Sequence, residues 1–307
     1  MKVLITGGTG LIGTRLAQAL TKRGDVPVVL SRDRARAKKA LGEGVEVIEG
    51  NPAHEGKWTK TLSSCQAVVN LAGEPVFGRR WNDRQIERLR DSRIESTKHL
   101  VQAIAAAEPR PKVLVNASAI GFYGDAPEGE VNETSSSGDD VMARLCVDWE
   151  KAAEEVEAHG VRLVIVRIGV VLDRDGGAIK QMVTPFKLGV GGPVGSGKQW
   201  VSWIHLDDLV GVFLAALDNE TFQGRINGTA PHPVRNKEFS QCLAAALHRP
   251  CFLPMPAFML RLIYGEVAFL VITGQQVMPS RADELGFSFK HPTCQSAMQA
   301  LFDNKTP

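Results

Sequence analysis

The chain has 307 residues, of which 44% are hydrophobic and 23% are charged, and its formal net charge is +2. This length and composition indicate a globular protein large enough to bury a core of its own. A charge so close to neutral excludes the strongly basic class of nucleic-acid-binding proteins, so we predict no nucleic-acid partner.

Five cysteines are scattered along the chain and none forms a C-x-x-C pair. An odd, dispersed set of this kind favours free thiols in a reducing compartment over a disulfide framework. The apolar run at the N-terminus is cut short by Gly7 and Gly8, so it does not have the length of a signal peptide. We therefore predict a cytoplasmic protein.

Short apolar runs rich in Val, Ile and Leu alternate with segments of helical period over the first 172 residues. After the first run, Ile12, Leu16 and Leu20 repeat on one face of a helix. Strand–helix alternation predicts an α/β fold, a Rossmann-type doubly wound parallel sheet with helices on both faces. The predicted strands are 2–6, 26–30, 45–49, 66–72, 112–118 and 162–172, and long helical patterns cover 83–107 and 140–158.

The sequence becomes rich in turn residues after Leu172 and mostly helical in pattern after residue 236. This change predicts a smaller, mostly helical C-terminal subdomain that would hold a substrate. We assign residues 1–172 and about 205–228 to the sheet domain, and residues 173–204 and 229–307 to the subdomain.

The apolar segment 258–274 resembles a membrane span. A spanning helix needs about 20 apolar residues, and Arg261 and Glu266 would lie unpaired in lipid. We therefore predict a core helix or a partner-facing helix here, and no membrane partner.

A glycine-rich loop, "ITGGTGLIG", follows the first predicted strand and opens the first helix. Glycines at this spacing allow a tight turn, a close approach of backbone to a pyrophosphate, and close packing of helix on strand. The helix N-terminus then offers free N–H groups to the phosphates. The alternative is a sharp turn without a ligand, which the position after the first strand disfavours. The predicted contacts with a dinucleotide are Gly7, Thr9, Gly10, Leu11, Ile12 and Gly13.

The end of the second strand predicts which dinucleotide binds. An NAD site carries a carboxylate about 20 residues past the glycines, where it bonds the ribose 2′-hydroxyl. Position 32 is an arginine preceded by Ser31, and both side chains suit a 2′-phosphate. Asp33 weakens this interpretation, and a solvated basic helix start is the alternative. We predict NADP(H) as the cofactor.

Four motifs resemble those of a known family: "TGGTGLIG", "NLAG" at 70–73, "SAIGFYG" at 118–124 and "GSGKQWVSWIHLDDLV" at 195–210. Together they resemble the extended short-chain dehydrogenase/reductases. More narrowly, "NLAGEPV…RRW", "GVVLDRDGGA", "GGPVGSGKQ" and "WIHLDDL" resemble an atypical subgroup with a C-terminal helical extension, known as epimerase family proteins. The resemblance implies that Leu71, Ala72 and Gly73 pass beneath the adenine and ribose, and that Arg93 reaches NADP(H).

The main family carries a catalytic tyrosine with a lysine four residues later, on one face of a helix. This chain has two tyrosines, and the residues four positions after Tyr123 and Tyr264 are proline and alanine. Alignment of the helix 140–158 with the family instead offers Asp140 and Arg144. Arg144 is able to hold ribose hydroxyls but does not deprotonate, so it does not shuttle protons.

Three further residues are candidates for chemistry. Ser118 would bond a substrate carbonyl or the nicotinamide amide, or is only a polar strand end. Tyr123 would replace the missing acid, or is a buried tyrosine with a satisfied hydroxyl. Glu74 would contact the cofactor or act as an acid or base, or is only a cap. The seven histidines show no metal-ligand spacing, so we predict no metal.

These features support two hypotheses. The first is an atypical NADP-dependent oxidoreductase or sugar-nucleotide epimerase that acts on a small polar substrate, with the helices 83–107 and 140–158 forming a homodimer contact by analogy with the family. The second is a non-catalytic NADP(H)-binding sensor.

Overall fold

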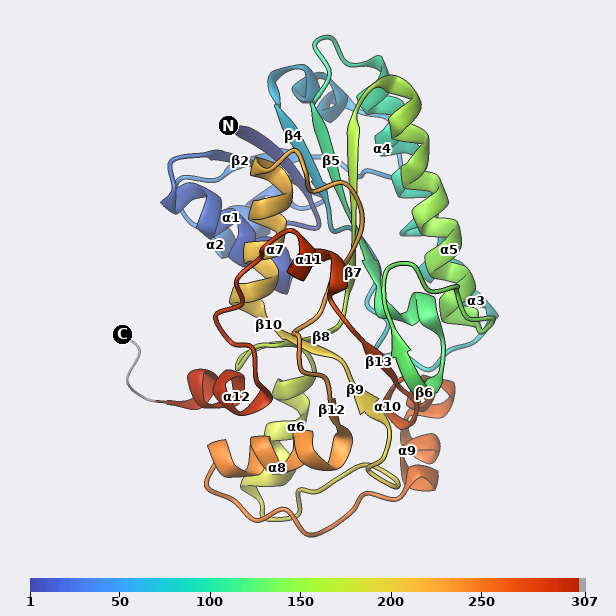
Figure 1. The fold of residues 1–307 in the computed structure, drawn as a ribbon. Helices are drawn as coiled ribbons and strands as arrows, with labels where there is room; N and C mark the ends of the chain where they lie inside the picture. Colours follow the sequence, from blue (N-terminus) through green and yellow to red (C-terminus); the bar gives the residue numbers. More distant parts are fainter. Residues whose placement is uncertain (304–307) are drawn as a thin grey trace.

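The computed structural model describes residues 1–303 and is built around one sheet of seven parallel strands (Figure 1). These strands are β1 (Lys2–Thr6), β2 (Val26–Ser31), β3 (Glu46–Glu49), β4 (Ala67–Asn70), β5 (Val113–Ala119), β7 (Arg162–Ile168) and β11 (Gly224–Gly228). Their order across the sheet is β11-β7-β5-β4-β1-β2-β3. The predicted Rossmann-type parallel sheet is confirmed.

The strand order reverses at β1. From β1 the chain adds β2 and β3 on one side, and β4, β5, β7 and β11 on the other. In open α/β sheets a ligand crevice forms outside the carboxyl ends of the strands at such a switch point. Thr6 and Asn70 end β1 and β4, so this position lies beside the glycine loop.

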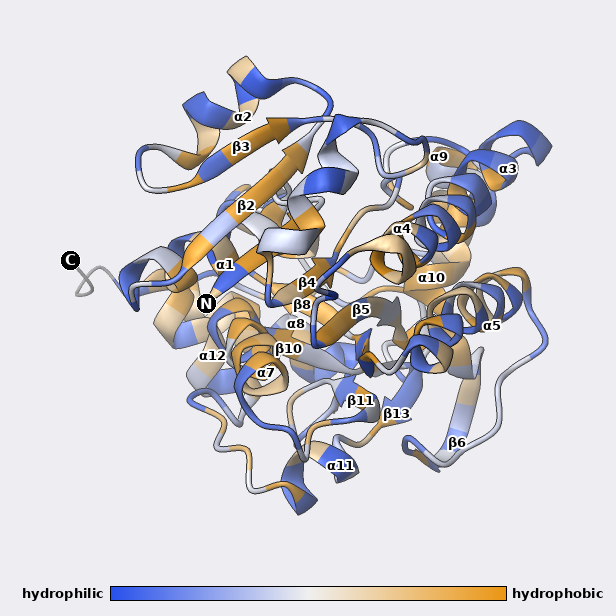
Figure 2. Cartoon of the chain, turned by 90° about the horizontal axis from the view of Figure 1, so that it is seen from above, coloured by the Kyte–Doolittle hydropathy of each residue, from blue (hydrophilic) through white to orange (hydrophobic). Residues whose placement is uncertain are grey.

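Helices cover both faces of the sheet. Successive strand residues point to opposite faces, so apolar side chains on both faces need to be buried. Val3 and Ile5 pack in the core beneath α1 and α7, whereas Leu4 packs in the core beneath α4. Figure 2 shows hydrophobic residues along β2, β4 and β5 between these layers. The flanking helices are α1 (Leu11–Lys22), α2 (Arg34–Leu41), α3 (Asp83–Asp91), α4 (Ile94–Ala106), α5 (Val141–Glu154) and α7 (Leu206–Asp218), with 3-10 turns η1 (Lys57–Ser64), η2 (Ile120–Tyr123) and η3 (Glu155–His159).

The predicted strand 162–172 is two strands in the structure. β7 ends at Ile168, and β8 (Val170–Leu172) leaves the sheet to pair with β10 (Trp203–His205). The two separate at Gly169, whose N–H donates to Gly228 O at 3.0 Å. A Cβ at this position would lie 2.6 Å from Ser202 O, so the backbones approach more closely than a side chain allows. Periodicity alone does not reveal this break.

The remaining elements lie mostly below the sheet in Figure 1. Helices α6, α8 and α12 share a separate hydrophobic core that includes Phe186, Phe239 and Met298. Residues 280–289 instead pack on the large sheet through Ala282 and Phe287. The two-part division of the chain stays a prediction. These elements are β6 (Ala126–Val131), α6 (Gly177–Lys187), β9 (Trp200–Val201), β12 (Val234–Arg235), α8 (Asn236–Ala246), α9 (Ala257–Tyr264), η4 (Gly265–Ala268), α10 (Phe269–Ile272), β13 (Gln275–Val277), α11 (Ser280–Glu284) and α12 (Cys294–Phe302).

The apolar segment 258–274 is divided among α9, η4 and α10, with a left-handed glycine, Gly265, after α9. Val267 and Ala268 are buried, whereas most of α9 faces outward. Within residues 1–303, no helix is both long and apolar enough to cross a membrane.

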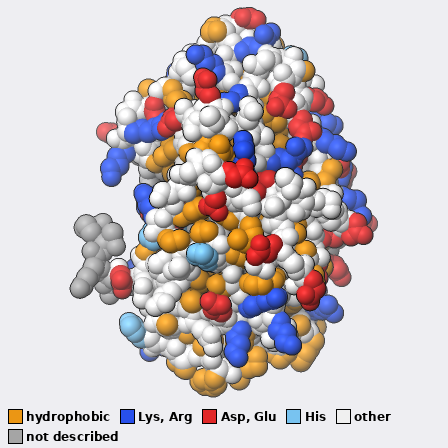
Figure 3. Space-filling model, in the orientation of Figure 1, with side chains coloured by type: hydrophobic (Ala, Val, Ile, Leu, Met, Phe, Trp, Pro, Cys, Tyr) orange, Lys and Arg blue, Asp and Glu red, His pale blue; other side chains and the backbone are white. Residues whose placement is uncertain are grey.

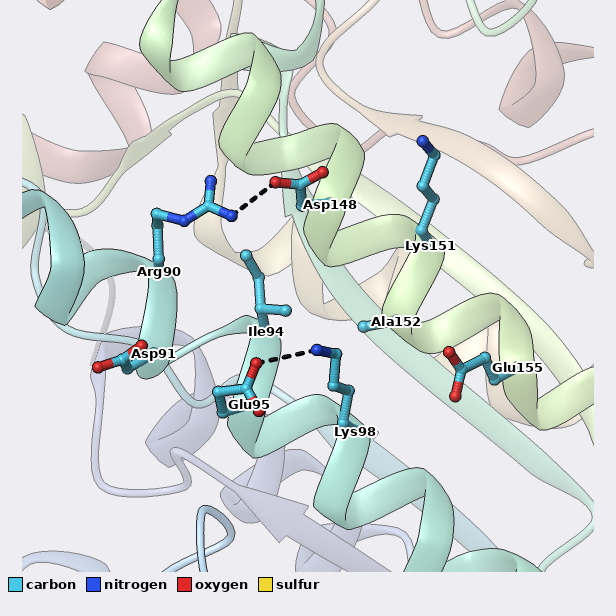
Figure 4. A pocket seen from close by; sticks show the side chains of 9 residues that line it. All are labelled: Arg90, Asp91, Ile94, Glu95, Lys98, Asp148, Lys151, Ala152 and Glu155. Atoms are coloured by element: carbon cyan, nitrogen blue, oxygen red, sulfur yellow. Dashed lines mark hydrogen bonds and ion pairs between the residues drawn. The ribbon is translucent and has the colours of Figure 1, made fainter.

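Helices α4 and α5 lie side by side and form a shallow groove of about 320 Å³ on their outer side (Figure 4). Arg90 pairs with Asp148 at 2.8 Å, and Lys98 pairs with Glu95 at 2.9 Å. All four of these side chains are about half exposed, so this face is charged, whereas obligate dimer faces are apolar. The homodimer that was predicted on these helices stays a prediction.

Candidate functional site

The four glycines of the loop have different surroundings. Gly7 has a φ of +66°, and a Cβ there would lie 2.4 Å from Leu71 O. A Cβ on Gly8 would meet the Val29 side chain at 2.6 Å, and one on Gly13 would meet Gly7 O at 2.5 Å. At Gly10 the nearest atom would be Gly7 O, at 3.3 Å, and the residue is exposed. Three glycines therefore pack the loop on the sheet, and Gly10 borders open space.

Within residues 1–303, no side-chain hydrogen bond caps the N-terminus of α1. Gly10 is the N-cap residue, it provides no side-chain hydrogen bond, and the first turn carries no acidic residue. The first N–H groups of a helix need partners, and together with the helix dipole they favour an anion. Thr9 and Gly10 are exposed at this end, and Leu11 and Ile12 are half-buried. The structure thus provides an open anion-binding helix terminus at the switch point of the sheet.

The turn at Gly176 and Gly177, which starts α6, packs on the same end of α1. A Cβ on Gly176 would lie 2.6 Å from a methyl carbon of Leu11. The second half of the chain therefore borders the glycine loop directly. Sequence reasoning missed this contact, although the "DGG" that precedes α6 marks a tight turn.

An open pocket of about 600 Å³ follows β2, where the sequence predicted the cofactor-selecting residues. Its side chains come from the start of α2 and the end of β3. Asp33 caps α2 by accepting the N–H of Arg36 at 2.9 Å, so the capping role accounts for this carboxylate. Ser31 is half-buried, and its hydroxyl is engaged with the backbone of Asp33. The pocket is lined by Arg32, Asp33, Arg34, Ala35, Lys38 and Glu49.

The predicted turn after β4 lies beside a half-buried arginine, Arg93. Arg93 stands between α3 and α4, where the structure breaks the long helix that was predicted over 83–107. A Cβ on Gly73 would lie 3.0 Å from Cζ of Arg93, and the guanidinium lies over the Trp149 ring at 5.2 Å. Leu71 and Ala72 are half-buried, and the Glu74 N–H donates to Ser92 Oγ at 2.9 Å.

The Arg93 guanidinium forms few hydrogen bonds for a cation that is partly removed from water. Its recorded hydrogen bond runs from Nη1 to Leu89 O at 3.3 Å, and it forms no ion pair within residues 1–303. Burial lowers the pKa of Arg93, and the neighbouring Cys146 and Glu74 offset this only in part. A half-buried guanidinium with unused donors is only partly satisfied. It is therefore suited to an anionic or polar ligand near Gly73.

A chain of buried polar side chains holds the carboxyl ends of the central strands together. The Thr6 hydroxyl donates to Asn70 Oδ1 at 2.6 Å, and Asn70 Nδ2 donates to Asn116 Oδ1 at 2.7 Å. Asn70 and Trp149 both donate to the Thr97 hydroxyl, at 2.9 and 3.0 Å, respectively. These bonds join β1, β4 and β5 to α4 and α5, so the edge of the crevice is rigid.

Ser118 and Tyr123, the two candidates for catalysis, belong to one buried network. Glu150 accepts the Ser118 hydroxyl at 2.7 Å and a bidentate pair of bonds from Arg167 at 2.9 and 2.8 Å. The Tyr123 hydroxyl accepts from Arg167 at 3.0 Å and donates to Asn227 Oδ1 at 2.7 Å. Burial raises the pKa of the Tyr123 phenol, although Arg167 opposes the shift.

The face of α5 that meets the end of β5 differs from the face predicted by alignment. Asp140 is the N-cap of α5 and accepts the N–H groups of Met142 and Ala143 at 2.8 and 2.9 Å. Arg144 is exposed, and its guanidinium donates to the backbone O of Asp139. The structure therefore gives Asp140 a capping role and leaves Arg144 exposed, and the assignment of the family's tyrosine and lysine positions to 140 and 144 stays a prediction.

Met142 and Cys146 occupy the position that the alignment gave to Asp140 and Arg144. They stand one turn apart, and a Cβ on Gly121 would lie 3.5 Å from Met142 Cβ and 3.9 Å from Cys146 Sγ. The Cys146 thiol also lies against Ser118 and Ala119. Burial raises the pKa of Cys146 to about 12, so this thiol is neutral at neutral pH. Sequence reasoning missed this pair because the alignment selected positions two residues earlier on the same helix.

A cluster of His205, Asp207 and His291 stands at the start of α7, with potential ligand atoms within 4.8 Å of one another. His205 Nδ1 accepts the Asp207 N–H at 3.1 Å, and Asp207 pairs with Arg15 at 3.0 Å. Burial and the adjacent His291 lower the pKa of His205 to about 4. A neutral imidazole whose Nδ1 accepts a hydrogen bond carries its proton on Nε2 and has no lone pair for a metal. The cluster is therefore built as a helix cap.

Comparison with known proteins assigns the chain to a family. Residues 3–227 match the NAD dependent epimerase/dehydratase family, and residues 255–301 match a domain of unknown function, DUF1731. The chain belongs to the NAD dependent epimerase/dehydratase family. The predicted resemblance to epimerase family proteins is confirmed, and the helical C-terminal extension corresponds to the second matched domain.

Relatives in this family are similar over nearly the whole chain. The chloroplastic epimerase family protein SDR39U1 homologue of Arabidopsis thaliana is 43% identical over 98% of this chain and 86% of its own. The crystal structure of human epimerase family protein SDR39U1 with NADPH is 37% identical, covers 99% of this chain and 100% of its own, and has a TM-score of 0.88. A nucleoside-diphosphate sugar epimerase from Corynebacterium glutamicum is 29% identical over 98% of this chain and 58% of its own, with a TM-score of 0.77.

Proposed function

We propose that this protein binds NADP(H) in the crevice between the glycine loop, the pocket after β2 and the turn at Gly73. The observation that carries the proposal is the uncapped N-terminus of α1, where Gly10 borders open space while the other loop glycines are packed. A pyrophosphate fits this terminus because it accepts the free N–H groups. The human relative solved with NADPH supports the same cofactor.

Different residues of the chain bind different parts of the cofactor. The N-terminus of α1 receives the pyrophosphate, and Arg32 with Ser31 receives the 2′-phosphate. Ala72 and Gly73 border the adenosine half, and Arg93 lies between Gly73 and the Cys146 thiol, which is next to the end of β5. The bound cofactor would supply a hydride donor or acceptor to a substrate. Arg144 is exposed and engaged with its own backbone, so its predicted contact with the ribose needs a rotated side chain.

Replacement of Arg32 by alanine tests the choice between the two dinucleotides. A charge-assisted hydrogen bond contributes about 1.5–3 kcal/mol, so NADPH affinity should fall about ten- to a hundredfold, while NADH affinity changes little. The ionic contact is exposed, so added salt should weaken NADPH binding more than NADH binding. Fluorescence titration of the two reduced cofactors measures both effects.

The matched control for this variant is Arg36→Ala. Arg36 lies in the first turn of α2, four residues after Arg32, and is also exposed, but it does not line the pocket after β2. It should leave the preference for NADPH intact. Equal losses from Arg32→Ala and Arg36→Ala, or a wild-type preference for NADH, would show that the 2′-phosphate is held elsewhere.

For the reaction, the first candidate is an oxidoreductase or sugar-nucleotide epimerase acting on a small polar substrate. Arg93 supports this candidate, because a half-buried cation with unused donors suits an oxygen that gains negative charge during hydride transfer. The name of the Corynebacterium relative supports a sugar nucleotide as the substrate. In this candidate Ser118 orients the substrate, although its proton is held by Glu150.

The second candidate is a non-catalytic NADP(H)-binding sensor. Met142 has no proton to transfer, and the Cys146 thiol has a pKa of about 12. The hydroxyls of Ser118 and Tyr123 already donate to buried partners. These four residues therefore favour binding without proton transfer on this side of the crevice.

An isotope experiment separates the candidates. NADPH deuterated at nicotinamide C4 is incubated with the protein and a panel of carbonyl compounds, and NADP⁺ is incubated with the protein and a panel of sugar nucleotides. The enzyme candidate predicts transfer of deuterium to at least one carbonyl compound, or inversion of a ring carbon in at least one sugar nucleotide, and a strong loss of this activity in Arg93→Met. Tight NADPH binding with no deuterium transfer in the first panel and no inversion in the second would leave the sensor as the function.

A further inference from the structure

One end of the molecule exposes an unusual concentration of apolar side chains. Within residues 1–303, nine of the thirteen exposed large hydrophobic side chains lie in three short segments, 188–190, 252–253 and 258–264. Phe258 is 70% exposed and Leu262 is 74% exposed. We call this surface the apolar pole, and it comprises Leu188, Val190, Phe252, Leu253, Phe258, Met259, Leu262, Ile263 and Tyr264.

The three segments form one continuous surface. The Gly195 N–H donates to Met255 O at 2.8 Å, and the Met255 N–H donates to Pro193 O at 2.8 Å. A Cβ on Gly192 would lie 2.1 Å from Leu253 O, so these backbones are in contact. Val194 and Leu260 pack in one small core beneath α9. The pole follows the lower edge of the molecule in Figure 3, where hydrophobic side chains gather below α6, α8 and α9.

The apolar pole is large for a protein that remains free in water. Three of its nine side chains are aromatic, and an aromatic side chain has about 150–250 Å² of surface, so at about half exposure these three alone present of the order of 300 Å². The six aliphatic side chains add to this area. The largest patch on an ordinary monomer is about 300–600 Å². The pole is therefore large enough to contribute to a specific attachment.

Basic residues predominate around the pole, although the exposed Glu266 lies in η4, directly after α9. The sequence contains no Asp or Glu from Gly176 to Leu206, or from Phe239 to Gly265. The same two stretches contain five basic residues, all of them exposed and none in an ion pair within residues 1–303. These residues are Lys180, Lys187, Lys198, Arg249 and Arg261. Arg80 adds a further cation, because its guanidinium donates to the carbonyls of Leu262 and Ile263.

This charge pattern indicates which class of partner binds the apolar pole. In a two-fold symmetric dimer the same patch faces itself, so the cations of one copy would face those of the other. An anionic bilayer surface matches both features, because apolar side chains enter the acyl boundary while basic side chains meet lipid headgroups. We propose that the apolar pole docks this protein on the surface of an anionic lipid membrane, with α9 lying in the interface.

The proposal changes one prediction from the sequence. Segment 258–274 was predicted to have no membrane partner because its charges and length exclude a span. That argument does not exclude surface attachment, in which Arg261 stays in the headgroup layer. Docking through α9 leaves α1, α2 and the glycine loop away from the bilayer (Figure 1), so the cofactor crevice stays accessible.

Vesicle co-sedimentation with the full chain tests the proposal. We expect binding to phosphatidylcholine vesicles that contain phosphatidylglycerol, at least tenfold weaker binding to phosphatidylcholine alone, and loss of binding at high salt. The variant Phe258→Ser/Leu262→Ser should weaken binding at least tenfold because it removes two inserting side chains. The variant Arg249→Gln/Arg261→Gln should weaken binding to the anionic vesicles by a similar factor.

Matched controls keep the test specific. Val26→Ser changes an exposed apolar residue outside the pole, and Lys57→Gln/Lys60→Gln removes two exposed charges elsewhere; both should bind like the wild type. Thermal unfolding checks that each variant is folded. We expect all of them to fold, because the changed side chains are exposed. No binding of the wild type to anionic vesicles would overturn the proposal, as would equal losses in the control variants. A dimer that dissociates on Phe258→Ser/Leu262→Ser would also overturn it, because the pole would then be a subunit interface.

Discussion

Gly10→Val should abolish NADPH binding and leave the protein folded. The φ of −80° and ψ of 175° at Gly10 are open to any residue, so a valine causes no backbone strain. A Cβ there meets no atom closer than Gly7 O at 3.3 Å, and the valine methyls point into the space outside the helix terminus. That space is where the pyrophosphate must approach the N–H groups of α1. We expect an affinity loss of a hundredfold or more, which is about 2.7 kcal/mol of binding free energy.

Gly13→Val is the matched comparison, because it adds the same side chain three residues later. A Cβ on Gly13 would lie 2.5 Å from both Gly7 O and Gly8 Cα, so this variant should lose stability before any effect on binding is measured. Thermal unfolding and reduced-nicotinamide fluorescence titration are measured on both proteins. A folded Gly10→Val that binds NADPH as well as the wild type would contradict the assignment of the loop.

The glycine loop shows what was predictable from the sequence. The spacing of the glycines alone indicated a tight turn, a close approach of the backbone to a pyrophosphate and a close contact of helix and strand. These three features were predictable because each of them involves residues that are near one another in the sequence. The structure distributes them over Gly7, Gly8, Gly10 and Gly13. The parallel sheet was also predictable, because few folds other than a parallel sheet covered by helices accommodate strands and helices that alternate along the chain.

The catalytic side of the crevice was not predictable to the same degree. The start of α5 depends on the capping bonds of Asp140, and a displacement of two residues turns a helix by about 200°. Alignment therefore selected Asp140 and Arg144, whereas Met142 and Cys146 face the end of β5. A capping residue such as Asp at this position is a signal that would have corrected the register.

The network around Glu150 was hidden because its members are distant in sequence. Ser118 and Glu150 are 32 positions apart, and Tyr123 and Asn227 are 104 positions apart. Ser118 and Tyr123 were therefore evaluated singly as catalytic candidates, without the partners that occupy their hydroxyls. Whether Ser118 also acts on a substrate stays a prediction.

Glu150→Gln should be the most destabilising of the conservative changes proposed here. Glu150 and Arg167 are 2% and 1% exposed, and their bidentate contact places both charges out of water. Removing one charge leaves the Arg167 guanidinium buried and uncompensated, stacked over the Phe122 ring at 3.4 Å. Breaking a buried pair in this way costs about 3–5 kcal/mol, a large part of the stability of a typical domain. Urea unfolding at neutral pH measures the loss.

Glu154→Gln, one turn along α5, is the control. Glu154 pairs with Arg225, but their side chains are 35% and 45% exposed, so this change should cost less than about 1 kcal/mol. A second comparison removes both buried charges. Glu150→Leu/Arg167→Met should be more stable than Glu150→Leu alone, because the stranded guanidinium is gone. If Glu150→Gln costs no more than Glu154→Gln, the guanidinium has found another partner or water. The network would then not be what fixes the Ser118 and Tyr123 hydroxyls.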